Sequence, residues 1–351
     1  VRFSTLEAAE DTLLERPISI ERPEVDFRLR LDPFEVELGR VWIDDPQVPL
    51  RLSGAVSATD TAWAYALDGE IGALTPESLL RAWPVSLAPR TRNWVVDNIQ
   101  KGAIETGQFA LRSQEGAGPI VYLNAGFKDA QVRYTRTLPV VENGKGSLTL
   151  DGNRFAVRVS EGTVTPTQGG SIDIAGSTFV IPNMRARPAE GQVMVAGVGP
   201  IEAVLSYLDS PKVEIMQKAN RPVDILSGRI RFGGRLTLPL RKGLRLPDMA
   251  LNFSGRATQV ASDVIVPNRT LSARALDVSV TNEKLQVSGS AELSGVPFKG
   301  SWTLPLPKPG EPAQASFVDG EVTLSAEAAH AFGVSLPKGA VSGSGPGQLR
   351  V

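Results

Sequence analysis

The sequence predicts a mainly β protein, built on a long, mostly antiparallel sheet that carries a few short helices. Two observations predict this class. Apolar residues alternate with polar ones along many short runs, as where Val25, Phe27 and Leu29 flank Asp26 and Arg28. This period of two gives a strand one apolar and one polar face. The chain of 351 residues also holds 34 Gly and 26 Pro, a content typical of turn-rich proteins.

The apolar members of these alternating runs are expected to share one face of the sheet. Alternation alone favours a two-layer sandwich, in which that face would be buried. An open groove is favoured by the low aromatic content, 6% of residues, and by the small number of helices that could cover a sheet. The residues predicted to line the groove are Phe27, Leu29, Leu148, Leu150, Phe155, Val157, Val159, Ile230, Phe232, Leu236, Leu238, Leu251, Phe253, Leu276, Val278, Leu285, Val287 and Trp302.

Helical signals are few. Thr75 precedes a Pro and an acidic residue, which predicts an N-cap and the first turn of a short helix. A second helix is expected over Arg90–Lys101, with Gly102 as its terminator. Together they form a helical pair near 76–102. Shorter helices are expected near 200–209 and 326–332.

The remaining punctuation suggests turns within one architecture. Asn-Gly or Asp-Gly pairs at 143–144, 151–152 and 319–320 predict hairpin turns. We expect an N-terminal β segment of the groove over 1–74, a helical insertion over 75–104 and a continuing β groove over 105–351. The chain begins at Val1 and has no apolar run long enough to span a bilayer, so we expect a segment excised from a longer protein.

The composition lacks the usual parts of catalytic and metal sites. The chain has no Cys and a single His, His330, which excludes a disulfide framework, a Cys nucleophile and a Cys/His metal site. His330 with Glu327 could form a general-base pair, but a histidine near a helix C-terminus explains the pattern equally. The 37 Lys+Arg residues face 38 Asp+Glu, without the basic excess of nucleic-acid binders. We expect no enzymatic activity, no cofactor, no metal and no nucleic acid.

One stretch resembles a known family. Leu80–Ile104, LRAWPVSLAPRTRNWVVDNIQKGAI, is similar to the signature of the YhdP-like branch of the AsmA-like proteins of Gram-negative bacteria. Ala125–Val164, Gly199–Pro211 and the run LSAEAAHAFGV near the C-terminus resemble later blocks of this family, whose relatives include AsmA, TamB and the bridge-like lipid transfer proteins. The motif positions are Trp83, Pro84, Pro89, Arg92, Trp94, Val95, Asn98, Ile99 and Gly102.

The resemblance implies a periplasmic segment of an intermembrane lipid transport protein. In the family, a long, curved sheet forms an open, taco-like hydrophobic groove that holds phospholipid acyl chains between the inner and outer membranes. An N-terminal helix anchors the protein to the inner membrane. The implied partners are a phospholipid or other acyl-chain lipid, the rest of the same long chain, and proteins of either membrane. The motif residues are implied to be structural, locking the helical pair across the sheet.

Three other functions stay open from the residues alone. Open sheet edges would suit a periplasmic scaffold or chaperone that assists outer-membrane protein assembly by strand addition. Alternation also suits a β-sandwich with a structural or carbohydrate-binding role. A β-helical enzyme that cleaves polysaccharides is disfavoured because no regular coil period appears.

Overall fold

The computed structural model describes residues 5–7, 19–21, 23–46, 48–58, 62–83, 85, 88–113, 119–307, 310–312, 314–334, 337 and 342–350. Strands make up 57% of it and helices 12%, and eighteen strands belong to antiparallel sheet, so the predicted fold class is confirmed. The chain divides into two compact units. Unit 1 comprises Val1–Arg136, Val140–Gly162 and Thr178–Ala189, and unit 2 comprises Thr137–Pro139, Thr163–Ser177 and Glu190–Val351.

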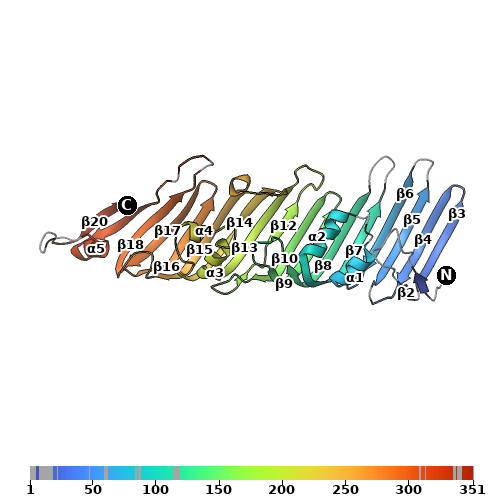
Figure 1. Ribbon diagram of the computed structural model, residues 1–351, viewed down its shortest axis with the longest axis horizontal. Coiled ribbons are helices and arrows are strands. Elements are labelled where there is room, and N and C mark those ends of the chain that lie inside the picture. The colour runs from blue at the N-terminus through green and yellow to red at the C-terminus, as the bar shows by residue number, and fades with distance from the viewer. Residues whose placement is uncertain are drawn as a thin grey trace. The chain divides into compact units, whose positions relative to one another are not determined.

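Unit 1 is an antiparallel sheet whose strands follow one another in sequence (Figure 1). Its strands are β3 (Glu24–Leu31), β4 (Phe34–Ile43), β5 (Leu50–Ala58), β6 (Trp63–Ile71), β7 (Ile99–Arg112), β8 (Ile120–Val132), β9 (Val141–Asp151), β10 (Arg154–Val164, which ends in unit 2) and β12 (Thr178–Ile181). The strands from β3 to β9 pair in that order, and β10 pairs with β12. Two short strands, β1 (Thr5–Glu7) and β2 (Ser19–Glu21), pair with each other.

Unit 2 repeats this plan. Its strands are β11 (Ile172–Asp173), β13 (Glu190–Pro200), β14 (Ser227–Pro239), β15 (Ala250–Ser262), β16 (Leu271–Thr281), β17 (Lys284–Leu293), β18 (Val296–Pro305), β19 (Phe317–Leu324) and β20 (Gly345–Arg350). They pair in that order, every pair antiparallel. Where one strand directly follows the next, as from β3 to β4 and from β16 to β17, this pairing keeps the turn short. The β6–β7 and β13–β14 connections instead contain helices.

The helices are short. Unit 1 holds α1 (Pro76–Ala82) and α2 (Pro89–Asn98), and unit 2 holds α3 (Ile201–Leu208), α4 (Ile215–Lys218), the 3-10 turn η1 (Leu246–Asp248) and α5 (Ala326–Ala331). The predicted helical pair and the helices near 200–209 and 326–332 are therefore confirmed, whereas α4 was not anticipated.

Local chemistry fixes the ends of these helices. The Thr75 hydroxyl accepts the Ser78 N–H at 3.1 Å, so the predicted N-cap of α1 is confirmed. The second helix is shorter than expected, because β7 already begins at Ile99. Gly102 is therefore not a helix terminator. It lies inside β7 with φ of 142°, close against Ala130 of β8.

Two of the three predicted hairpin turns are wrong. Asp151-Gly152 does lie at the turn that follows β9. Asn143-Gly144 instead lies within β9, where Asn143 has φ of 53° and the β8–β9 register shifts, as in a β-bulge. Asp319-Gly320 lies within β19, where Gly320 faces Gly300 of β18. In both cases the glycine serves a close backbone approach inside the sheet instead of a turn.

Candidate functional site

Cross-strand register places the predicted residues of unit 2 on one face of its sheet. Residues directly opposite each other on neighbouring strands carry their side chains on the same face. One row across seven strands consists of Gly197, Phe232, Gly255, Val278, Val287, Trp302 and Val318. The next rows are Val195, Gly234, Phe253, Val280, Leu285 and Leu304, followed by Val193, Leu236 and Leu251. We call these rows, with their neighbours Ile230, Leu238 and Leu276 on the same strands, the apolar face of unit 2.

Unit 1 has the same arrangement. Phe27 of β3 lies opposite Leu38 of β4, and the row continues through Gly54, Leu67, Leu111 and Val121. A second row links Leu150 to Leu123, Phe109, Gly69, Leu52, Val41 and Val25. Leu29 and Leu148 share the face of Phe27 and Leu150 by alternation along β3 and β9. On β10, Phe155 and Val157 lie opposite Ile181 and Phe179 of β12, and Val159 shares their face by alternation. The rows that hold Phe27 and Leu150, with Leu29 and Leu148 beside them, form the apolar face of unit 1.

These apolar side chains are partly open to solvent. Phe27 and Leu29 expose 51% and 48% of their surface, and the other sixteen predicted residues are half-buried. Among the described residues no Phe, Tyr or Trp is buried, and the buried hydrophobic residues are mostly Ala, Val and Ile. A two-layer sandwich would bury its aromatic side chains between the layers. The distribution therefore fits a sheet with one apolar face left largely uncovered.

The opposite face of each sheet is polar. In unit 2, Arg256 Nη1 lies 3.1 Å from Asp277 Oδ1 on the neighbouring strand, and Arg350 Nε lies 3.5 Å from Asp319 Oδ1. In unit 1, a comparable cross-strand pair joins Arg51 of β5 to β6. Because these side chains are largely exposed, each pair adds little to stability. Their consequence is a charged face that keeps one side of the sheet well solvated.

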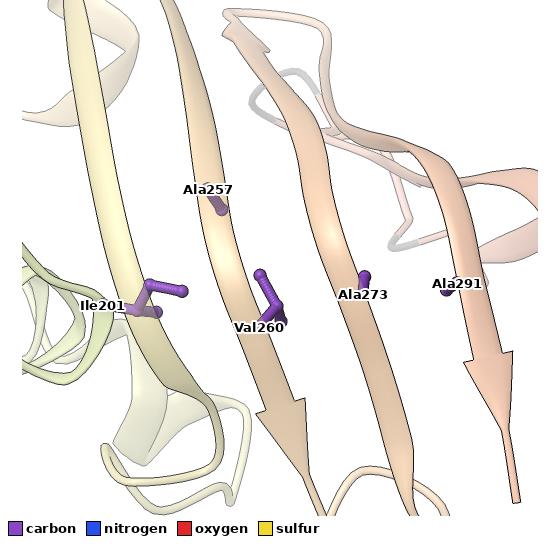
Figure 2. Packing of buried hydrophobic residues seen from close by; sticks show 5 residues of the cluster. All are labelled: Ile201, Ala257, Val260, Ala273 and Ala291. Atoms are coloured by element: carbon purple, nitrogen blue, oxygen red, sulfur yellow. The ribbon is translucent and has the colours of Figure 1, made fainter. Parts of the chain in front are cut away.

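Helices cover only part of the apolar face of unit 2. Ile201, at the start of α3, packs against Ala257 and Val260 of β15, and the cluster extends to Ala273 and Ala291 on the next two strands (Figure 2). Nearby, Phe332 at the end of α5 meets Phe298 of β18 edge-on, with ring centroids 5.8 Å apart. Two predicted groove residues, Ile230 and Leu276, pack partly against this cluster. The covered strip therefore lies beside the open rows that contain Phe232 and Phe253.

Aromatic rings on the open rows lie over glycines of the neighbouring strand. A Cβ added at Gly197 would be 2.6 Å from Cε1 of Phe232, and one added at Gly234 would be 2.6 Å from Cδ1 of Phe253. In unit 1, the Phe109 ring lies over Gly69 in the same way. A ring that lies flat on a glycine covers backbone atoms that would otherwise be exposed, and it projects little from the sheet. These rings therefore leave no large protrusion on the apolar face.

The residues of the family-like motif form the α1–α2 region. Arg92 is 8% exposed, and its Nη2 donates to the Leu80 carbonyl at 3.4 Å, joining α2 to α1. Asn98 Nδ2 donates to the Trp94 carbonyl at 2.7 Å at the end of α2, while the Trp94 side chain is 46% exposed. Trp83 follows α1, Pro89 begins α2 and Gly102 lies in β7. Pro84 lies outside the described residues.

The titratable groups with perturbed pKa values cap helices. A hydrogen bond from the Gln217 backbone N–H holds the pKa of Asp209 below its ordinary value of 3.8. The pKa of Glu327 is lowered by its own backbone N–H and by the Ser325 hydroxyl. The backbone carbonyl of His330 accepts from Arg269 Nη2 at 2.6 Å. In the described part of the chain, no three His, Asp or Glu side chains are placed to share a metal ion.

Comparison with known proteins identifies no relative of the chain. No protein-family model, no curated protein and no solved structure matches the chain. Of the helices that the structure describes, none combines the length and apolarity needed to cross a membrane. The apolar faces are thus the main candidate for a binding surface.

Proposed function

We propose that this chain is a segment of an AsmA-like intermembrane lipid transport protein of the YhdP-like branch, and that its apolar faces hold phospholipid acyl chains without catalysis. One observation carries the proposal: the apolar row from Gly197 to Val318, which crosses seven strands of unit 2 and is half-buried at every position but Gly197. Apolar surfaces of this extent on a folded protein are typical of binding sites.

The dimensions and chemistry of the row suit an acyl chain. Six strand spacings of about 4.8 Å give a row of roughly 29 Å. The hydrocarbon core of a bilayer is about 30 Å thick and holds two chains end to end, so one acyl chain fits along the row with room to move. Each methylene group removed from water contributes about 0.8 kcal/mol. Because such contacts have no preferred direction, a bound chain can slide from one strand to the next.

The cellular setting of the proposal rests on the similarity of Leu80–Ile104 to the family motif. We place the segment in the periplasm, in a longer chain that is anchored to the inner membrane. The partners in this setting are a phospholipid, the remaining parts of that chain and membrane proteins at either end. Polar outer faces with pairs such as Arg256–Asp277 suit an aqueous compartment.

A site-specific crosslinking experiment tests lipid binding to the apolar face. A photoreactive amino acid is placed at Phe232 or Val157, and at Arg231 or Arg158 as matched controls on the opposite face of the same strands. After expression in a Gram-negative host and irradiation, phospholipid bound to the purified chain is identified by mass spectrometry. We expect adducts at Phe232 and Val157 and at least about tenfold fewer at the two arginine positions, since an acyl chain gains nothing on a charged face.

Two results would contradict the proposal. Purified chain without phospholipid, together with equal crosslinking on both faces, would show that the apolar face does not hold lipid. Capture of unfolded outer-membrane protein strands in place of lipid would instead support the scaffold or chaperone function.

A further inference from the structure

A basic loop lies at the edge of the apolar face of unit 2. It spans residues 240–249 and joins β14 to β15. Leu236 and Leu238 of β14 precede it, and Leu251 of β15 follows it. Because the two strands are antiparallel neighbours, the 240–249 loop continues from the end of the sheet at which these three leucines lie. A ligand on this part of the apolar face therefore lies next to the loop.

The 240–249 loop has an excess of positive charge. It contains Arg241, Lys242 and Arg245 against a single acidic residue, Asp248. In each of the other connections between β13 and β20, Asp and Glu equal or outnumber Lys and Arg. The loop is therefore the one positively charged connection in that part of the sequence.

A carboxylate fixes the shape of the loop without neutralising it. Asp248 Oδ1 lies 3.1 Å from Arg241 Nη2, and Asp248 Oδ2 accepts the Arg245 backbone N–H at 2.9 Å. The Asp248 side chain is 18% exposed, whereas those of Arg241 and Arg245 expose 49% and 81% of their surface. One half-buried carboxylate thus holds the loop closed between two arginines whose side chains stay open to solvent.

The neighbouring hairpin anchors the end of the loop. Asn282, between β16 and β17, donates from Nδ2 to the Met249 carbonyl at 2.7 Å, and its Oδ1 accepts the Leu251 N–H at 2.9 Å. At the tip of the loop Lys242 is exposed, and a Cβ added at Gly243 would meet no described atom within 4 Å. The basic side chains therefore project from an anchored loop with open space beside them, which lowers the ordering cost of binding an anion.

We propose that the 240–249 loop binds the phosphate group of the lipid whose acyl chain lies on the apolar face of unit 2, and that it selects anionic headgroups. This inference rests on the proposed function, since it assigns the headgroup end of the same site. Arg and Lys are the side chains that bind phosphate through charge-assisted hydrogen bonds. Leu240, which is 37% exposed, lies between Leu238 and Arg241 in the sequence, so apolar residues lead directly to the basic ones.

The net charge of the headgroup decides the selection. Phosphatidylglycerol carries one negative charge, on its phosphate. Phosphatidylethanolamine carries the same phosphate together with an ammonium group, which the excess positive charge of the loop repels. Because several exposed charges act together, we expect a preference for phosphatidylglycerol of about tenfold at low salt, equivalent to about 1.4 kcal/mol.

Lipid loading of the purified chain tests this selection. The chain is incubated at low salt with vesicles that contain phosphatidylglycerol and phosphatidylethanolamine in equal amounts, and size-exclusion chromatography then separates it from the vesicles. Mass spectrometry gives the ratio of the two lipids bound to the chain. We expect about tenfold more phosphatidylglycerol, and a smaller ratio at high salt because exposed charges are screened.

Removal of charge from the loop is compared with the same change elsewhere on β14. Lys242→Gln/Arg245→Gln leaves the loop without net charge, so the ratio should fall to about one, while the total lipid bound changes less than about twofold because the apolar face is intact. Arg229→Gln/Arg231→Gln removes the same charge from the polar face of β14 and should leave the ratio unchanged. Lys242→Arg/Arg245→Lys keeps the charge of the loop and should keep the ratio.

A soluble phosphate ester distinguishes a lipid headgroup from free phosphate. Glycerol 3-phosphate, which has no acyl chain, is added in large excess and compared with sodium chloride at the same ionic strength. Because burial of the acyl chain supplies most of the affinity of a lipid for the apolar face, the ester should change the lipid ratio no more than the salt does.

Four results would overturn the inference. The unmodified chain could bind both lipids equally, or the ratio could stay the same in Lys242→Gln/Arg245→Gln. The ratio could also fall as far in Arg229→Gln/Arg231→Gln, which would make the preference an effect of total charge. Loss of the preference with glycerol 3-phosphate alone would make the loop a site for free phosphate esters. In all four cases lipid is still bound and the proposed function stands, whereas a chain that binds neither lipid would contradict the proposed function and this inference together.

Discussion

Gly197 lies directly beneath the Phe232 ring, and its replacement by Ala tests the flat packing of aromatic residues on the apolar face. The added Cβ would be 2.6 Å from Cε1 and 2.8 Å from Cε2 of Phe232, well inside van der Waals contact. The ring must tilt away from the sheet, and overpacking of this kind typically costs about 1–3 kcal/mol. We expect the free energy of unfolding to fall by about 2 kcal/mol.

Gly233→Ala is the matched control for this experiment. Gly233 lies on the neighbouring strand but on the polar face, and its added Cβ would meet only the Val195 carbonyl oxygen, at 3.2 Å. Glycine inside a strand is less stable than alanine by roughly 0.5–1 kcal/mol. Gly233→Ala is therefore expected to be neutral or slightly stabilising. Urea titration with linear extrapolation measures both variants.

A double-mutant cycle separates the ring from other causes. In a Phe232→Leu background the ring is absent, so Gly197→Ala should cost less than about 1 kcal/mol. An equal cost of Gly197→Ala in both backgrounds would refute the explanation, because the strain would then come from the backbone. So would a Gly197→Ala variant as stable as Gly233→Ala.

Three further outcomes are expected. Val278→Asp places a carboxylate on the apolar face and should greatly reduce the phospholipid that co-purifies, whereas Ser279→Asp on the opposite face should not; equal losses would contradict the assignment of the faces. Thr75→Ala removes the N-cap of α1, which accepts at 3.1 Å, and should lower the free energy of unfolding by about 1 kcal/mol; urea titration would show no change if the cap were unimportant. Asp209 has a folded-state pKa below its ordinary 3.8, so its ionised form stabilises the fold at neutral pH, and this contribution is lost as pH falls through the folded pKa. Asp209→Asn should therefore be less stable than the native chain near pH 7 and equal to it in strong acid, as unfolding measured against pH would show; a difference that does not depend on pH would contradict this.

The sequence predicted the faces of the sheet because alternation is a local property. Once Phe232 and Leu236 are in one strand, the pleat alone sends them to the same side. The register later joined them to Val278 and Trp302 on neighbouring strands. Local signals also predicted α1, since the Thr75 side chain acts within one turn.

The remaining features depend on contacts between distant parts of the chain. The pairing of Phe232 with Gly197 is fixed by the β13–β14 register, which no local pattern reveals. Gly320 follows Asp319, and such a pair is typical of turns. It nevertheless lies inside β19, where Gly300 of the neighbouring strand β18 lies directly opposite it and in close contact. The short α4 was missed because its N-cap, Glu214, has a left-handed backbone with φ of 53° and its first turn is held by the Asp209 carboxylate.

Side-chain size along single strands of unit 2 distinguishes the covered strip from the open rows. On β15, β16 and β17 the buried cluster that includes Ile201 of α3 contains the small residues Ala257, Ala273 and Ala291, beside the larger Val260. Further along the apolar face the same strands carry larger residues: Phe253, Val278, Val280, Leu285 and Val287. These large side chains are half-buried, and the apolar surface that they expose to water is costly unless another apolar body covers it. Size as well as alternation therefore distinguishes the buried cluster from the open rows of the apolar face.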